Sequence, residues 1–342
     1  MRVEAQAPAR VDLAGGTVDI WPLYLFHPGA QTVNIAIRCY ASCVIDTRAD
    51  QRIELVSQDQ ELRESWEDLT NLSLGASRLP LLRELVMFFA PQRGLNITTS
   101  SQVPAGAGLG GSSALNIALC GGLARVTGKR CTRRTILEIA KNVEAIVIRV
   151  PTGWQDYFPA LYGGANSVHL ERDGVKVERL PLPFAEVEKR FVLCYTGQPR
   201  NSAINNWEVM KAHIDNDERV LKNFDQITTI SGQMREALLA RDWDDVAELL
   251  AREWENRKHN FKGISTPKID RLMEQTRKHG TLAAKVCGAG GGGCVVFMVR
   301  PGAKPAVENA LTHMGGKVIN FAISRTGLEV RADLADRTRK TR

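Results

Sequence analysis

Glycines and two adjacent serines are concentrated in the segment PAGAGLGGSSAL, residues 104–115, which carries no charged side chain. Glycines let a backbone approach a ligand without a Cβ clash. Ser112 or Ser113 stands where a helix should begin, as an N-cap residue would. The free N–H groups and the dipole of that helix favour a phosphate, and a serine hydroxyl could reach a bound Mg²⁺. The segment predicts a phosphate-binding loop, with an ordinary glycine-rich turn as the alternative.

Several known catalytic patterns do not fit this segment. It contains the letters G-x-G-x-x-G, but the position expected for a ribose-binding acid falls in the basic run RCTRRT. The P-loop pattern is missing, because Ser or Thr follows neither of the two Gly-Lys pairs. The protein-kinase signatures H-R-D and D-F-G are missing too, and no G-x-S-x-G surrounds either serine. A dinucleotide site and a nucleophilic serine are therefore disfavoured.

Two further segments place carboxylates beside glycine turns. In APARVDLAGGTVDI, Arg10 and Asp19 lie on either side of a glycine pair, and in VPTGWQDYFPALYGG, Asp156 lies in a loop. Carboxylates on such loops suit the binding of hydroxyl groups or the abstraction of a proton. Each of them alone could equally be structural.

Strands and helices must position these residues. In the first half, we expect strands within residues 2–20, 32–48, 52–58 and 94–104, helices within 59–91, 112–128 and 132–150, and a loop at 151–165. In the second half, we expect strands at 190–197 and 317–324, helices across 202–260, 266–279 and 305–315, and a glycine-rich segment at 283–299. Prolines and mixed charge near residues 178–190 predict a boundary between domains 1–182 and 183–342.

Composition indicates a soluble globular protein. The net charge of +7 suits an anionic small substrate, and the basic clusters lack the interleaved aromatic residues expected of a nucleic-acid surface. No apolar run reaches membrane-spanning length, and the N-terminus resembles no secretory signal, so we expect a cytoplasmic protein with no membrane partner. The seven cysteines show no C-x-x-C spacing, which favours reduced thiols over a zinc site.

Taken together, the motifs resemble those of the GHMP kinase superfamily. The first two motifs are the segments around Arg10 and the glycine loop, and the third is KVCGAGGGGCVVF at 285–297. The stretches AGGTVD, TGWQDYFPALYGG, YTGQPRNSA and GISTPKID resemble the heptose 7-phosphate kinase and fucose kinase branch in particular. The chain departs from that branch at Val18, at Trp154, where Arg or Lys is usual, and at Tyr157, where Gln is usual.

The resemblance implies an α+β fold with two domains. The N-terminal ATP-binding domain would have a mixed sheet and helices, and the C-terminal domain would be a ferredoxin-like α/β sandwich. Ser113 and Glu144 would ligate Mg²⁺. The residues that match the ATP-phosphate loop are Pro104, Gly106, Ala107, Gly108, Leu109, Gly110, Gly111, Ser112 and Ser113.

The same resemblance assigns the reacting groups. Asp156 matches the proposed catalytic base, and Arg10 matches the basic residue beside it. Asp156 is also an expected substrate-binding residue. Asp19 could accept hydrogen bonds from a diol of the substrate, and Arg200 could hold a phosphate or carboxylate. Gly16 and Gly290 are the other two expected substrate-binding residues. Because a strand and not a helix follows the third motif, we expect that motif to form a tight glycine turn beside the phosphate loop.

The expected activity is an ATP- and Mg²⁺-dependent transfer of phosphate to a sugar hydroxyl, with the anomeric hydroxyl as the expected acceptor. A mevalonate or phosphomevalonate kinase is the alternative enzyme, and a non-catalytic sensor of sugar or nucleotide is a more remote reading. The expected partners are ATP and a small sugar, without nucleic acid, in a monomer or homodimer.

Overall fold

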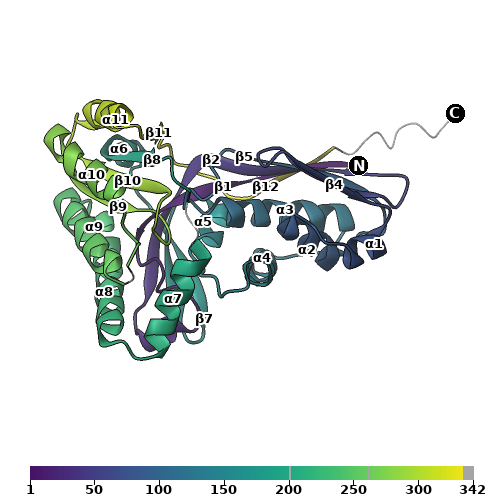
Figure 1. Cartoon of the computed structure of the whole chain (residues 1–342), viewed down its shortest axis with the longest axis horizontal. Helices are drawn as coiled ribbons and strands as arrows, with labels where there is room; N and C mark the ends of the chain where they lie inside the picture. The colour runs from purple at the N-terminus through teal and green to yellow at the C-terminus, as the bar shows by residue number, and fades with distance from the viewer. Residues whose placement is uncertain (200–201, 261, 334–342) are drawn as a thin grey trace.

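A mixed sheet forms the larger part of the computed structural model, which describes residues 1–199, 202–260 and 262–333 (Figure 1). Its strands follow the order β12-β1-β2-β5-β3-β4, with β6 paired to β2 and β7 paired to β6. Only the β3–β5 pair is parallel within this sheet of the described residues. The strands are β1 (Arg2–Ala14), β2 (Gln31–Thr47), β3 (Ile53–Ser57), β4 (Leu62–Trp66), β5 (Leu95–Ser101), β6 (Ala165–Glu171), β7 (Gly174–Leu180) and β12 (Glu329–Asp333).

Helices cover one face of this sheet, as Figure 1 shows. They are α1 (Leu69–Leu74), α2 (Pro80–Phe89), α3 (Gly111–Thr127), α4 (Arg133–Ile148) and α5 (Tyr157–Tyr162), with a short 3₁₀ turn η1 (Leu23–Phe26). Helix α3 is buried at every position from Ser113 to Ala124, because its sequence carries no charge until Arg125. It packs against β1 and β2 and so holds the glycine loop, which precedes it, against the strand that carries Arg10.

A second, antiparallel sheet follows in the chain, with the order β11-β8-β10-β9. All six residues of the central strand β10 are buried. Its strands are β8 (Phe191–Tyr195), β9 (Thr281–Val286), β10 (Cys294–Val299) and β11 (Lys317–Ile319). Its helices are α6 (Phe184–Arg190), α7 (Ser202–Ile214), α8 (Glu218–Ala240), α9 (Trp243–Lys258), α10 (Pro267–Thr276), η2 (Arg277–His279) and α11 (Lys304–His313). The mixed sheet and this antiparallel sheet confirm the predicted α+β class.

Several elements differ from the sequence expectations. The segment 59–91 begins with strand β4, because alternate residues of LRESW face solvent, and helices follow only from Leu69. The expected loop 151–165 contains α5, whose residues 157–161 are all buried. Only residues 317–319 of the expected strand 317–324 form β11, and the hairpin β6–β7 and strand β12 were not expected.

The end of the described chain returns to the first sheet. Strand β12 pairs with β1, from Arg2 opposite Asp333 to Gln6 opposite Glu329. The strands of the second sheet all lie between residues 191 and 319. The division into domains 1–182 and 183–342 stays a prediction.

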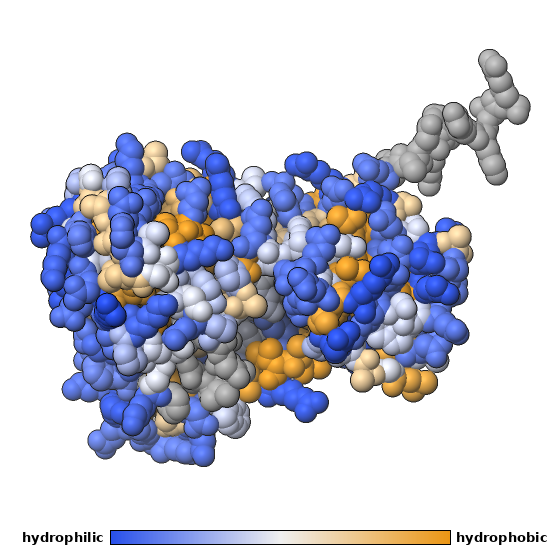
Figure 2. Space-filling view, turned by 45° about the horizontal axis from the view of Figure 1, so that its top comes forward, coloured by the Kyte–Doolittle hydropathy of each residue, from blue (hydrophilic) through white to orange (hydrophobic). Residues whose placement is uncertain are grey.

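Polar and charged residues predominate on the face shown in Figure 2, and apolar residues show through it in patches. The large hydrophobic side chains that remain exposed include Trp21, Phe26, Ile146 and Trp207. None of the helices in the described ranges has the length and the hydropathy that a membrane span requires.

Candidate active site

The glycine loop joins β5 to α3 and leaves the start of the helix open. The N-cap residue is Gly110, which has a left-handed φ of 69° and makes no side-chain cap. The left-handed φ favours glycine here, and a Cβ at Gly110 would also lie 3.1 Å from Cγ of Asp156 and press on that side chain. The expectation that Ser112 or Ser113 caps the helix was wrong. The hydroxyl of Ser113 instead donates to Glu144, 2.8 Å away, so the first N–H groups of α3 remain available to a ligand.

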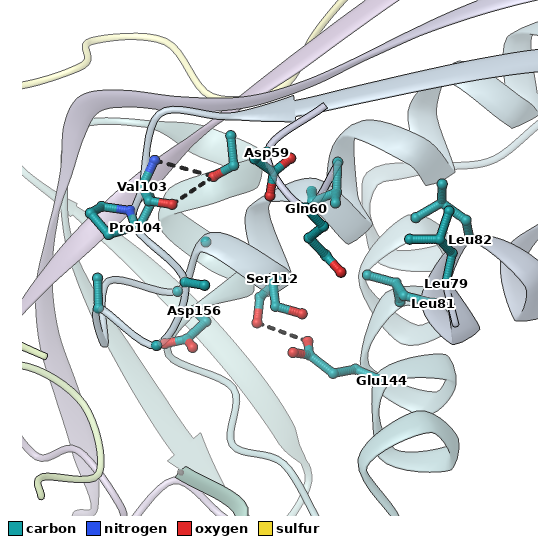
Figure 3. A pocket seen from close by; sticks show the side chains of 18 of the residues that line it. Asp59, Gln60, Leu79, Leu81, Leu82, Val103, Pro104, Ser112, Glu144 and Asp156 are labelled. Carbon is teal, nitrogen blue, oxygen red and sulfur yellow. Dashed lines mark hydrogen bonds between the residues drawn. The ribbon is translucent and has the colours of Figure 1, made fainter. Parts of the chain in front are cut away.

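A cavity of about 500 Å³, the large cavity, lies over this loop (Figure 3). Asp156, Ser112 and Glu144 meet at one end of it, and Leu79, Leu81 and Leu82 lie at the other. Every predicted ATP-phosphate residue lines it except Leu109, which is fully buried and whose carbonyl accepts the backbone N–H of Arg10 at 2.9 Å. The open helix end and glycine backbone fit phosphates, and the apolar end fits a purine base.

The carboxylate of Glu144 lies in the wall of the large cavity. Its carboxylate, on α4, accepts hydrogen bonds from Ser113 and from the hydroxyl of Tyr157, at 2.8 and 2.6 Å. Burial raises the pKa of Glu144, the hydrogen bonds from Tyr157 and Ser113 oppose that shift, and the charge of Asp156 adds to it. A carboxylate and a hydroxyl beside a phosphate site are a donor set that Mg²⁺ accepts, so these residues fit the predicted metal.

Arg10 is buried in the middle of β1 and faces the glycine loop. Its Nη1 donates to the carbonyl of Gly108 at 2.6 Å, and its Nη2 forms an ion pair with Oδ1 of Asp156. Burial opposes the charge of Arg10, but the carboxylates of Asp156 and Asp12 outweigh it and raise the pKa of Arg10. The guanidinium therefore stays charged and holds Asp156 at the edge of the loop.

A second space of about 160 Å³, the small pocket, meets the large cavity at Asp156, Ser112 and Glu144. Asp19 lies in its wall and is 1% exposed. The Oδ2 atom of Asp19 accepts the backbone N–H of Gln155 at 2.8 Å, whereas its Oδ1 atom is buried without a hydrogen-bond partner. Burial raises the pKa of Asp19 to about 6, the N–H of Gln155 opposes this, and the charge of Asp156 adds to it.

Four charged side chains are buried behind the small pocket: Asp12 on β1, Glu253 and Arg257 on α9, and Lys285 on β9. We call them the buried ion cluster. Asp12 lies 2.8 Å from Arg257 and 3.2 Å from Lys285, and Glu253 lies 3.4 and 3.0 Å from the same two cations. Burial would raise the pKa of Asp12, but Lys285 and Arg257 lower it to about 2. The cluster thus joins β1 to α9 and to β9, which both belong to the C-terminal half of the chain.

Arg257 also reaches the small pocket. Its Nη2 donates to the hydroxyl of Thr17 at 3.0 Å, and the side chain lines the pocket although it is only 2% exposed. Sequence reasoning missed Arg257, because a charged residue on a polar amphipathic helix looks like a solvent-exposed one. It also missed Thr152, Gly153 and Gln155, whose only signal was their place beside Asp156. The leucines of the large cavity were missed because their spacing is that of an ordinary core helix.

The remaining predicted residues lie at or beyond the edge of the site. Gly16 lines neither cavity. It packs against the buried ion cluster, since a Cβ there would lie 2.6 Å from Oδ2 of Asp12 and 2.8 Å from the guanidinium of Arg257. Gly290 lines neither cavity, although Gly288 and Ala289 line the small pocket. Arg200 lies outside the described residues.

The third motif packs against the glycine loop, as predicted. The N–H of Cys294 donates to the carbonyl of Ala107 at 2.7 Å. A Cβ at Gly293 would lie 2.6 Å from the same oxygen, so the two backbones are in contact. The motif is therefore a turn that supports the phosphate loop.

Two protein-family models match the chain. The model of the GHMP kinases N terminal domain matches residues 76–164, and the model of the GHMP kinases C terminal domain matches residues 234–317. Together the two models cover half of the chain. The N-terminal match contains the glycine loop, Glu144 and Asp156, and the C-terminal match contains the cations of the buried ion cluster.

Individual relatives span the chain almost from end to end. The D-glycero-alpha-D-manno-heptose 7-phosphate kinase of Campylobacter jejuni is 27% identical over 337 residues, which is 96% of this chain and 98% of that protein. The mevalonate kinase of Thermococcus sibiricus is 29% identical over 352 residues, with the same coverage of each chain. The structure of a D-glycero-D-manno-heptose 1-phosphate kinase from Bacteroides thetaiotaomicron has the same fold, with a TM-score of 0.78, 24% identity and coverage of 96% and 99%. This chain therefore belongs to the GHMP kinase family, whose members transfer phosphate from ATP.

Proposed function

We propose that this protein transfers the γ-phosphate of ATP to a hydroxyl group of a sugar. The observation that carries the proposal is the unpartnered Oδ1 atom of Asp19, buried in the small pocket. A buried carboxylate oxygen without a partner is costly unless a ligand donates to it, and a vicinal diol supplies such donors. The small pocket meets the large cavity at Asp156, so an acceptor held by Asp19 would lie next to the end of a bound triphosphate.

Asp156 and Arg10 would carry out the transfer. Asp156 would accept the proton of the attacking hydroxyl, which is a poor nucleophile at neutral pH. The Nη2 of Arg10 would hold the carboxylate of Asp156 in place and stabilise charge on the reacting oxygens. Ser113 and Glu144 would hold Mg²⁺, which when bound offsets the charge of the phosphates. The N–H groups at the start of α3 would orient the phosphate chain so that the reacting atoms are aligned.

The charge of the small pocket favours a sugar over mevalonate. Mevalonate carries a carboxylate, and three carboxylates already line this pocket, those of Asp19, Asp156 and Glu144. Arg10, one of the two arginines there, is already paired with Asp156. An uncharged polyol donates hydrogen bonds to such a pocket without adding a negative charge to it.

The decisive experiment measures ADP release with a panel of sugars, sugar phosphates, mevalonate and phosphomevalonate, and locates the new phosphate by NMR. Turnover of a sugar or sugar phosphate, with the anomeric hydroxyl as the expected position, supports the proposal. Turnover of mevalonate or phosphomevalonate alone overturns it. Binding of ATP and sugar without any ADP release would instead identify a non-catalytic sensor.

The acceptor KM is expected to depend on pH through Asp19. With a pKa of about 6, Asp19 is ionised above pH 6 and both of its oxygens accept hydroxyl donors, whereas below pH 6 one oxygen carries a proton and the acceptor capacity falls. Acceptor binding is therefore weakened as pH falls, and KM should rise below pH 6 by up to about tenfold per pH unit. Steady-state kinetics from pH 5 to 8, as an assay range, test this expectation. The Asp19→Asn variant should show a high KM that no longer changes with pH, and a persistent dependence would assign the titration to another group.

Substitution of Gly153 by Ala is expected to weaken acceptor binding. A Cβ at Gly153 would lie 2.0 Å from Oδ2 of Asp19, so the carboxylate must move away from the N–H of Gln155. A displacement of this kind costs about 10²-fold in kcat/KM for the acceptor. Initial-rate kinetics should show that loss with a nearly unchanged KM for ATP. A Gly232→Ala variant is the matched control, because its Cβ would make only an ordinary contact of 3.4 Å with the side chain of Gln31, and equal kinetics in the two variants would contradict the expectation.

A further inference from the structure

A third space of about 340 Å³, the side hollow, adjoins the small pocket. The two share Thr152, and Trp21 of the side hollow directly follows Ile20 of the small pocket in the chain. The rest of its wall comes from the C-terminal half of α4 and the loop after it. An acceptor that is longer than the small pocket would extend into the side hollow.

The side hollow and the small pocket differ in charge. The charged residues that line the side hollow are both cations, Lys141 and Arg149. Among the described residues, neither of them forms an ion pair with a carboxylate. The small pocket presents carboxylates instead. A ligand that occupies both spaces would therefore place hydroxyl donors at one end and negative charge at the other.

An aromatic side chain determines where the ammonium group of Lys141 lies. The Nζ of Lys141 is 4.3 Å from the ring centroid of Trp154, which is buried and packs against Phe158. A cation–π contact of this length holds the ammonium group without neutralising its charge. Trp21 is 57% exposed, so an apolar ring face is available beside the cations.

We propose that the side hollow binds a phosphate group of the acceptor, at the end remote from the reacting hydroxyl. This proposal rests on the proposed function and specifies its substrate class as a sugar phosphate. A phosphomonoester carries close to two negative charges at neutral pH, which Lys141 and Arg149 balance, and a guanidinium can bind two of its oxygens. Trp21 would cover the carbon chain between the two ends. Lys141 and Arg149 are thus residues that determine specificity.

The test compares acceptors that differ only in the distal phosphate, namely D-mannose with D-mannose 6-phosphate and a free heptose with its 7-phosphate. We expect the phosphorylated member of a pair to have at least about 10²-fold higher kcat/KM, as hydrogen bonds to charged groups imply. In Lys141→Met and Arg149→Met, KM for the phosphorylated acceptor should rise about 10- to 100-fold. The kinetics of the unphosphorylated acceptor and the KM for ATP should be unchanged.

Two further variants separate charge from structure. Lys141→Arg retains the cation and should retain the preference for the phosphorylated acceptor. Lys278→Met, an exposed substitution on η2, should leave all constants unchanged. Equal use of a sugar and its phosphate, or a preference that survives in the Lys141→Met/Arg149→Met double variant, overturns the phosphate site and leaves the sugar kinase intact. The absence of turnover with every sugar and sugar phosphate overturns the proposed function itself.

Discussion

Replacement of Asp156 by Asn is expected to lower kcat about 10²- to 10⁴-fold, the range associated with loss of a general base. The amide keeps the size of the side chain but cannot accept the proton of the attacking hydroxyl. Asp156 lies where the large cavity and the small pocket meet, and its ion pair with Arg10 fixes the position of its carboxylate. The KM for ATP should stay close to that of the wild type, because the glycine loop is not altered. ADP release at saturating acceptor measures the effect.

The size of the loss distinguishes two roles for Asp156. A fall of less than about tenfold would show that the carboxylate orients the acceptor and that the proton leaves by another route. The matched control is Asp173→Asn, the same substitution in the exposed β6–β7 turn, which should retain full activity.

Replacement of Arg257 by Met is expected to destabilise the protein by about 3–5 kcal/mol, as is typical when one partner of a buried charge pair is removed. Arg257 lies 2.8 Å from Asp12 and 3.4 Å from Glu253, and all three side chains are buried. Without Arg257, only Lys285 would remain in the buried ion cluster to balance two carboxylates. The midpoint of chemical denaturation, compared at equal slope, reports the change.

The neighbouring Arg252 provides the matched control for that substitution. It lies on the same helix, is half-exposed, and pairs with Glu248 at 3.7 Å. An exposed pair of this kind contributes about 0–1 kcal/mol, so Arg252→Met should leave the midpoint almost unchanged. If Arg257→Met were as mild as Arg252→Met, the charges of the buried ion cluster would have to be screened by water. The difference between the two variants therefore measures how far water is excluded from the buried ion cluster.

Residues that a short segment defines were the most predictable part of the candidate site. The glycine loop, Arg10, Asp19 and Asp156 each stand in a recognisable local pattern, and the structure brings all four to the two adjoining spaces. Glu144 was placed by its position on a helix, and it lies against Ser113 as expected. Local patterns suffice here because loop conformation and helix register depend on nearby residues.

Contacts between residues far apart in the chain could not be predicted from the sequence. Arg257 meets Asp12 across 245 positions of the chain, and no local pattern indicates which buried cation balances which carboxylate. The serine cap failed because α3 begins at Gly111 with Gly110 as its N-cap, which places both serines inside the helix, where the hydroxyl of Ser113 donates to Glu144 on another helix. Strand β12 was missed because its residues look like a charged tail, and only its pairing with β1 makes it a strand.

That pairing has a consequence for how the protein is made. Strand β1, which carries Arg10 and Asp12, is synthesised long before β12, one of its two neighbours, because the paired residues Gln6 and Glu329 are 323 positions apart. Until β12 is synthesised, the backbone groups of Arg2 to Gln6 have no partner on that side, and an open strand edge of this kind invites pairing with other chains. The first sheet can therefore be completed only after all strands of the second sheet have been made, so the edge of β1 stays open while the second sheet is synthesised.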